Sequence, residues 1–209
     1  MMYLGLSVLG ILAVLLVSEW GWRRHWLENE VGRKFVHITV GSFVAFWPFF
    51  LGWNEIRLLS VAFLVAVALS SRLKIFKAIH SVQRPTFGEV CFALTVGLLT
   101  FVTHSKGIYA AALLQMSLAD GFAAIFGNKY GRGNTYHLVG HTKSIIGTVA
   151  FIVTSLALLV GYDAYSAHGL SAVVMAGIAL GAALLENITP VGLDNLAVPL
   201  FVALVLTNL

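Results

Sequence analysis

The sequence contains few charged residues and a single cysteine. Charged residues make up 11% of the 209 residues, whereas 59% are hydrophobic. A chain with so little charge cannot cover the surface of an ordinary soluble globule, so this class is excluded. The lone Cys91 excludes an intrachain disulfide and a thiolate metal cluster. Its apolar neighbours indicate that it packs as a small apolar side chain.

The sequence also lacks the polar and apolar alternation that is typical of β-strands. Its first apolar segment lacks the basic start and cleavage pattern of a signal peptide, so we interpret it as a retained span. Long apolar runs are present instead. They predict an all-α, polytopic transmembrane helix bundle with about eight helices, at about 3–18, 35–53, 55–71, 88–103, 107–127, 144–161, 169–186 and 192–208.

The basic residues predict how these helices are oriented. Of the 13 Lys and Arg residues, 11 lie in the connections that follow the first, third and fifth predicted helices. Cytoplasmic connections hold most such residues, so both termini are predicted on the non-cytoplasmic side. Topology signals and anionic headgroups account for the net charge of +4, and we therefore exclude nucleic acid as a partner.

Three acidic residues lie close to the predicted cytoplasmic ends of helices. Asp120 stands inside an apolar segment, where a carboxylate costs about 2.5–3.5 kcal/mol on insertion scales, so its presence indicates a function. Pairing inside the bundle is the alternative for Asp120, and helix capping is the alternative for Asp194. Together with Glu186, these carboxylates suit a hard cation such as Mg²⁺. Zinc is disfavoured because no two histidines lie four residues apart within a predicted helix; His137 and His141 have this spacing but lie in the predicted loop.

A segment rich in glycine and cations follows Asp120. Flexible glycines let backbone amides turn toward a ligand, and cations neutralise phosphate, although a cytoplasmic loop shows the same composition. Lys143-Ser144 resembles the end of a Walker A motif, but Thr142 replaces its glycine, so we do not predict a P-loop. The candidate residues here are Asn128, Lys129, Gly131, Gly133, Lys143 and Ser144.

Further polar candidates precede two other predicted helices. Arg33 and Lys34 are either ligand contacts or interfacial charges. His37 lies one turn inside the span, and its structural alternative is a neutral side chain bonded to a backbone carbonyl of a neighbouring helix. Arg84 belongs either to the site or to the end of a loop. Near the C-terminus, Pro199 leaves the carbonyl of Asn195 without its helical partner and therefore open to a ligand or a neighbour.

Four groups of residues follow one another along the chain: Arg33-Lys34 with His37 and Gly41, Arg84 with Gly88-Glu89, LADGFAAIFGNKYG with Lys143-Ser144 and Gly147, and Glu186 with Asp194-Asn195 and Pro199. In this order they resemble the membrane lipid-alcohol kinases, a family that includes dolichol kinase, phytol kinase and CTP-dependent diacylglycerol kinase. More distantly they resemble CDP-diacylglycerol synthases. The resemblance to the kinases implies Mg²⁺-dependent phosphoryl transfer from CTP, or another nucleoside triphosphate, to the hydroxyl of a polyprenol, a phytol-like alcohol or diacylglycerol.

On this hypothesis, residues 1–209 form one integral-membrane kinase-like domain, with a first span and interfacial segment over 1–32 and a catalytic bundle over 33–209. Asp120, Asp194 and Glu186 are the expected metal ligands, and the general base is Asp120, Asp194 or His37. The predicted catalytic residues are Asp120, Asp194, His37 and Lys143. The predicted nucleotide-binding residues are Arg33, Lys34, Arg84, Asn128, Lys129, Gly131, Gly133 and Ser144.

Two other functions stay open from the sequence. A cytidylyltransferase would form a CDP-lipid and release pyrophosphate, and a small transporter would place charge along a path through the bundle. The expected location is a plasma (inner) membrane or endomembrane, with the active site facing the cytoplasm. The expected partners are the lipid bilayer, a lipid alcohol and a nucleoside triphosphate, and homo-oligomerisation stays open.

Overall fold

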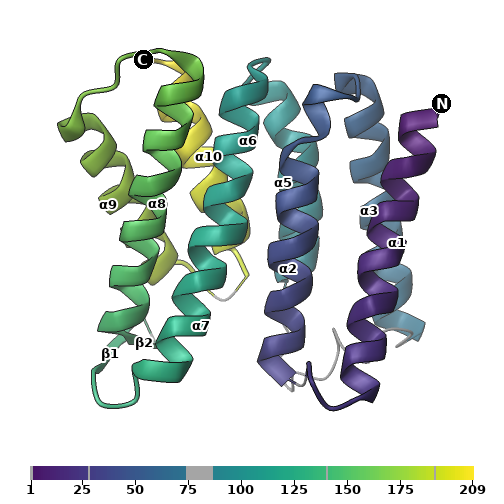
Figure 1. Cartoon of the computed structure of the whole chain (residues 1–209), viewed down its shortest axis with the longest axis horizontal. Helices are drawn as coiled ribbons and strands as arrows, with labels where there is room; N and C mark the ends of the chain where they lie inside the picture. Colours follow the sequence, from purple (N-terminus) through teal and green to yellow (C-terminus); the bar gives the residue numbers. More distant parts are fainter. Residues whose placement is uncertain (1, 28, 74–86, 140, 191) are drawn as a thin grey trace.

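The computed structural model describes residues 2–27, 29–73, 87–139, 141–190 and 192–209, and over these residues it is an all-α bundle (Figure 1). Both chain ends lie at one end of the bundle, and a short β-hairpin lies at the other. The predicted fold class is confirmed. The helices are α1 (Met2–Arg23), α2 (Asn29–Ala45), α3 (Trp53–Leu73), α5 (Gly88–Val102), α6 (Lys106–Leu114), α7 (Asp120–Tyr130), α8 (Ile145–Ser166), α9 (Ala172–Ile188) and α10 (Asp194–Thr207).

Three helical rods in the described part of the chain are long and apolar enough to cross a membrane by themselves. They are α1, the continuous rod over residues 106–130, and α8. The helices α5, α9 and α10 are shorter but equally apolar. Large apolar side chains are exposed on the outside of the bundle, Leu9 and Val173 among them, as expected where lipid replaces water. These features are those of an integral membrane protein.

Helix α2 differs from its predicted bounds at both ends. It begins at Asn29 rather than near residue 35, so Arg33 and Lys34 are helical residues. It ends at Ala45 rather than near residue 53, and a 3₁₀ turn, η1 (Trp47–Phe49), follows. Pro48 is the physical reason, because it has no N–H to donate to the helical ladder and its ring crowds the preceding turn.

The rod over residues 106–130 contains a π-helical turn, η2 (Gln115–Ala119), between α6 and α7. A π turn inserts an extra residue into the helix and changes which carbonyls find helical partners, and such turns are frequent at functional sites. Here it directly precedes Asp120, the first residue of α7. The backbone irregularity therefore lies immediately before the intramembrane carboxylate.

A two-stranded antiparallel hairpin, β1 (Thr135–Leu138) and β2 (His141–Ser144), replaces the irregular loop that the sequence predicts between the fifth and sixth helices. The prediction of a loop was wrong for these eight residues. Its register pairs Tyr136 with Lys143, so these two side chains lie on the same face of the hairpin. Helix α7 also continues to Tyr130, which makes Asn128 and Lys129 helical residues.

Candidate active site

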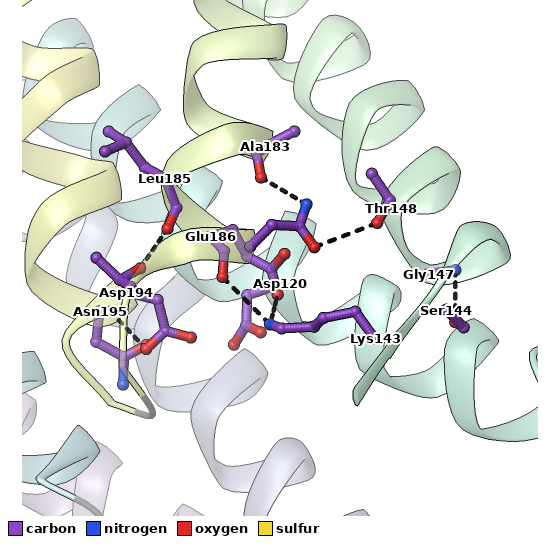
Figure 2. A network of polar contacts seen from close by, with 12 residues as sticks. Asp120, Lys143, Ser144, Gly147, Thr148, Ala183, Leu185, Glu186, Asp194 and Asn195 are labelled. Atoms are coloured by element: carbon purple, nitrogen blue, oxygen red, sulfur yellow. Dashed lines mark hydrogen bonds and ion pairs between the residues drawn. The ribbon is translucent and has the colours of Figure 1, made fainter. Parts of the chain in front are cut away.

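Three carboxylates from three helices meet near the hairpin end of the bundle. Asp120 opens α7, Glu186 lies in the last turn of α9, and Asp194 opens α10. One oxygen from each carboxylate lies within 4.8 Å of the other two. Figure 2 shows these side chains turned toward one another. The structure thus brings together the three residues that the sequence predicts as metal ligands.

The donor set and its spacing fit a hard divalent cation. Octahedral Mg²⁺ binds oxygens at about 2.0–2.1 Å, which places them roughly 3–4 Å from one another, so small side-chain rotations would close the 4.8 Å separations. All three donors are carboxylate oxygens, the type that Mg²⁺ prefers over nitrogen and sulfur. No second group of three acidic, His or Cys side chains with such spacing occurs among the residues that the structure describes.

Lys34 on α2 forms a buried ion pair with Asp120. Its Nζ lies 2.5 Å from the Oδ2 of Asp120, and both side chains are almost completely enclosed. A buried charge is tolerated only when it is paired and hydrogen-bonded, so each residue stabilises the charged form of the other. Lys34 is therefore an interior residue of the site and not an interfacial charge.

His37 lies one turn further along α2 and contacts both the π turn and Asp120. Its Nε2 lies 3.0 Å from the carbonyl oxygen of Met116 and 3.3 Å from the Oδ2 of Asp120. The carbonyl can only accept, so Nε2 carries the proton and donates it, which leaves a lone pair on Nδ1. The sequence left two alternatives for His37, a bond to a neighbouring backbone carbonyl or a place in the site. The structure shows both.

Lys143 reaches the site from strand β2 and pairs with the carboxylate of Glu186 (Figure 2). Its Nζ also donates to the carbonyl oxygen of Glu186 at 3.2 Å, in the last turn of α9, where a cation is favoured. Burial opposes the charge of Lys143, but Glu186 outweighs it, and the pKa of Lys143 lies above its usual value. The ammonium is thus charged at neutral pH, and its stabilising effect is lost only above about pH 10.4.

Asp194 differs from the other two carboxylates in having no lysine partner within the described residues. Its Oδ1 accepts a hydrogen bond from the backbone N–H of Asn195 at 3.1 Å. It occupies the first helical position of α10, after Leu193 at the N-cap, so the predicted alternative of a side-chain cap is not what the structure shows. The helix dipole still favours its negative charge there.

The turn into α10 is fixed by contacts with α5. The side chain of Asn195 donates to the carbonyl of Gly88 at 3.0 Å. The carbonyl of Asn195, left without a helical partner by Pro199, accepts from the hydroxyl of Thr95 at 2.8 Å. Gly192 has a φ of +94° and lies against the backbone of Gly88, so a side chain there would be strained and would clash. These contacts hold Asp194 in place.

Tyr136 is a site residue that the sequence analysis missed. Its hydroxyl lies 2.5 Å from the side-chain oxygens of both Thr148 on α8 and Asn187 on α9. Because Tyr136 pairs with Lys143 across the hairpin, this network positions the strand that carries Lys143. Thr135 and Tyr136 are residue types that favour a strand, and this was the available sequence signal.

Most of the other predicted nucleotide-binding residues are exposed at the hairpin end of the bundle or have a packing or capping role there. Asn128, Lys129 and Gly133 are exposed, and the hydroxyl of Ser144 caps α8 by accepting from a backbone N–H. A Cβ on Gly131 would meet the carbonyl oxygen of Gly127 at 2.4 Å, so Gly131 permits close packing. Their binding of nucleotide stays a prediction. Arg33 is half-buried, and Arg84 lies outside the described residues.

The chain is similar in sequence to known proteins from three organisms. The chain is 36% identical to a phytol kinase of Synechocystis sp., over 96% of this chain and 88% of that protein. It is 30% identical to a probable chloroplastic phytol kinase 2 of Glycine max, over 87% of this chain and 66% of that protein. It is 27% identical to a probable chloroplastic phytol kinase 2 of Oryza sativa, over 74% of this chain and 55% of that protein. No family model and no solved structure matches the chain.

Proposed function

This chain belongs to the phytol kinase family of membrane lipid-alcohol kinases, and from this premise we propose that it transfers the γ-phosphoryl group of CTP, or of another nucleoside triphosphate, to a lipid alcohol. The names of the relatives favour a phytol-like alcohol over dolichol or diacylglycerol as the acceptor. The basic connections predict that the site faces the cytoplasm, where nucleoside triphosphates are available.

The observation that carries the proposal is the convergence of Asp120, Glu186 and Asp194 at one end of the bundle. These residues would hold Mg²⁺, which supplies a positive charge beside the phosphate oxygens. Phosphoryl transfer depends on positioning and electrostatics more than on covalent chemistry, so a cluster of fixed charges is the feature it requires.

Lys34 and Lys143 would provide the remaining positive charge. Each ammonium has three donors; Lys34 donates one to Asp120, and Lys143 donates to both the carboxylate and the carbonyl of Glu186, so each keeps at least one donor for phosphate oxygens. Both side chains are held by ion pairs and partly or fully enclosed, which limits the reorganisation needed when a triphosphate binds. Asp194 has neither lysine as its partner and is therefore the carboxylate most available to the metal.

The hydroxyl oxygen of the lipid is the nucleophile. It forms a bond to the γ-phosphorus, the bond from that phosphorus to the β–γ bridging oxygen breaks, and the hydroxyl proton passes to a base on the protein. We assign this base to Nδ1 of His37, because Nε2 is occupied by the carbonyl of Met116 and because Asp120 is already paired with Lys34. The products are a lipid monophosphate and a nucleoside diphosphate.

The test uses purified protein in lipid nanodiscs with a panel of alcohols crossed with CTP, ATP, GTP and UTP, with and without Mg²⁺. We expect phytyl monophosphate and CDP, identified by mass, only when Mg²⁺ is present. Formation of a CDP-lipid and pyrophosphate from phosphatidate would instead support the cytidylyltransferase. Failure to phosphorylate any alcohol with any nucleotide would refute the kinase, and uptake into liposomes without nucleotide would favour the transporter.

A further inference from the structure

A cavity of about 370 Å³ lies between α1, α2, α3 and α5. Its size is within the range of roughly 300–1,000 Å³ that small-molecule sites occupy. Most of its wall is aliphatic or aromatic, and we call it the α1–α3 groove. Among the residues that line it are Ile11, Leu12, Val36, Ala62, Ala66 and Phe92.

The polar residues of the groove are concentrated at one end. Arg33 and His37 stand on successive turns of α2, Glu89 lies in the first turn of α5, and Asn195 lies in the first turn of α10. His37 also contacts Asp120, and Asn195 directly follows Asp194. The polar end of the groove therefore lies next to the carboxylate cluster, and the rest of its length is apolar.

The groove is open to the surroundings along α1 and α3. Val8 and Leu12 on α1 and Ala62 and Ala66 on α3 line it and are nevertheless exposed. Helix α1 as a whole is loosely attached, because only Ser7, Ser18 and Gly21 of its residues are buried. A hydrocarbon chain from the bilayer can thus enter sideways, without passing through water.

We propose that the α1–α3 groove binds the hydrocarbon chain of the lipid alcohol and places its hydroxyl beside His37. This inference rests on the proposed function and adds the location of the acceptor. An apolar chain would gain contact with Ile11, Val36 and Phe92, while the hydroxyl would meet the groove's polar end. The polar end of the groove lies beside the carboxylates, which supports this occupant: a lipid alcohol has a long apolar chain and one hydroxyl that must reach the phosphate.

Blocking the groove tests the proposal by the chain-length preference of the enzyme. Ala62→Trp and Ala66→Trp each place an indole in the groove from an exposed position on α3. We expect the ratio of kcat/KM for a C20 isoprenoid alcohol to that for a C5 alcohol to fall about tenfold for every two methylenes displaced. Val61→Trp and Val65→Trp are matched controls, because both residues are exposed on α3 outside the groove lining, and the ratio should stay at its wild-type value.

Photolabelling separates this inference from the kinase assignment, because it requires no turnover. A C20 alcohol with a diazirine on its chain is irradiated with the protein in nanodiscs without nucleotide. Labels should appear on the groove residues of α1 and α3, decrease with excess unlabelled phytol and decrease in Ala66→Trp. Labels spread equally over the outer faces of α3, or a chain-length ratio unchanged by both groove variants, would overturn the groove proposal even if lipid phosphorylation is observed.

Discussion

The carboxylate cluster and the α1–α3 groove lie next to each other but are built differently. Asp120 and Glu186 are buried, and each is paired with a lysine. The helices around them approach closely through small residues, so that Ala119 and Ala182 have no exposed surface. The groove, in contrast, is walled by a sparsely packed α1 and by exposed apolar side chains. The dense region fixes the positions of charges, and the loose region leaves room for an apolar chain.

The physical basis of this difference is the cost of burying charge. An unpaired charge in a region without water costs several kcal/mol, so the buried carboxylates Asp120 and Glu186 each need a lysine at a fixed position. Apolar contacts are not directional, and a hydrocarbon chain needs only room and an apolar wall. We therefore expect substitutions in the cluster to affect catalysis and stability strongly, and substitutions in the groove to affect mainly the choice of acceptor.

The largest effect is expected for Asp194→Asn. The asparagine keeps the size of the side chain and its bond to the N–H of Asn195 but removes a metal ligand. Phosphoryl transfer should fall on the order of 10³-fold while the unfolding temperature stays unchanged. Asp163→Asn is the control, because Asp163 lies on α8 near the opposite end, where its side chain accepts from the backbone N–H of Leu170. Wild-type kcat and Mg²⁺ dependence in Asp194→Asn would contradict the role of the cluster.

A double-mutant cycle tests how the dense region depends on its buried pair. Lys34→Met leaves the buried carboxylate of Asp120 without its cation, and should destabilise the protein by about 3–5 kcal/mol. The double variant Lys34→Met, Asp120→Asn should regain most of this stability but none of the activity. Thermal unfolding in detergent measures the first quantity, and lipid phosphorylation measures the second. Purely additive losses of stability would show that the two residues do not stabilise each other.

A smaller effect is expected where α7 and the hairpin pack together. Gly131→Ala places a methyl group 2.4 Å from a backbone carbonyl oxygen and should cost about 1–3 kcal/mol. Gly133→Ala meets no atom within 4 Å and should change stability by less than about 0.5 kcal/mol. Chemical unfolding compares the two. A raised KM for nucleotide in Gly133→Ala, with stability intact, would support the predicted binding role of this glycine.

The smallest change in stability is expected in the groove. Leu12→Ala shortens a side chain that is 44% exposed, so the free energy of unfolding should change by less than about 0.5 kcal/mol. The KM for a C20 alcohol should rise a few-fold, because apolar contact with the chain is lost. Unfolding curves and chain-length kinetics measure both quantities. If Leu12→Ala instead lowered the free energy of unfolding by several kcal/mol, the contrast between the groove and the carboxylate cluster would be wrong, because α1 would then be tightly packed.

Much of the polar side of the site was predictable from single residues. Asp120 stands out in any apolar sequence, and Glu186 and Asp194 belong to a connection that the charge bias assigns to the same end. The pairing of Lys34 with Asp120 was not predictable, because 86 residues separate them and the sequence contains no distances. The hairpin was missed because four-residue strands are too short to produce a clear alternation beside spans of about 20 residues.

The sequence by itself determined that the chain is an all-α membrane bundle, because apolar runs of span length leave few other ways to satisfy the backbone. It also determined which residues are costly enough inside such a bundle to need a function. Only the tertiary structure decided their partners. Asp120 pairs with Lys34, Glu186 pairs with Lys143, and His37 bonds to the carbonyl of Met116. Met116 lies in a π turn, which its residue types do not predict. Ion pairs and hydrogen bonds act over a few ångströms, and the packing of helices distant in the chain sets those distances.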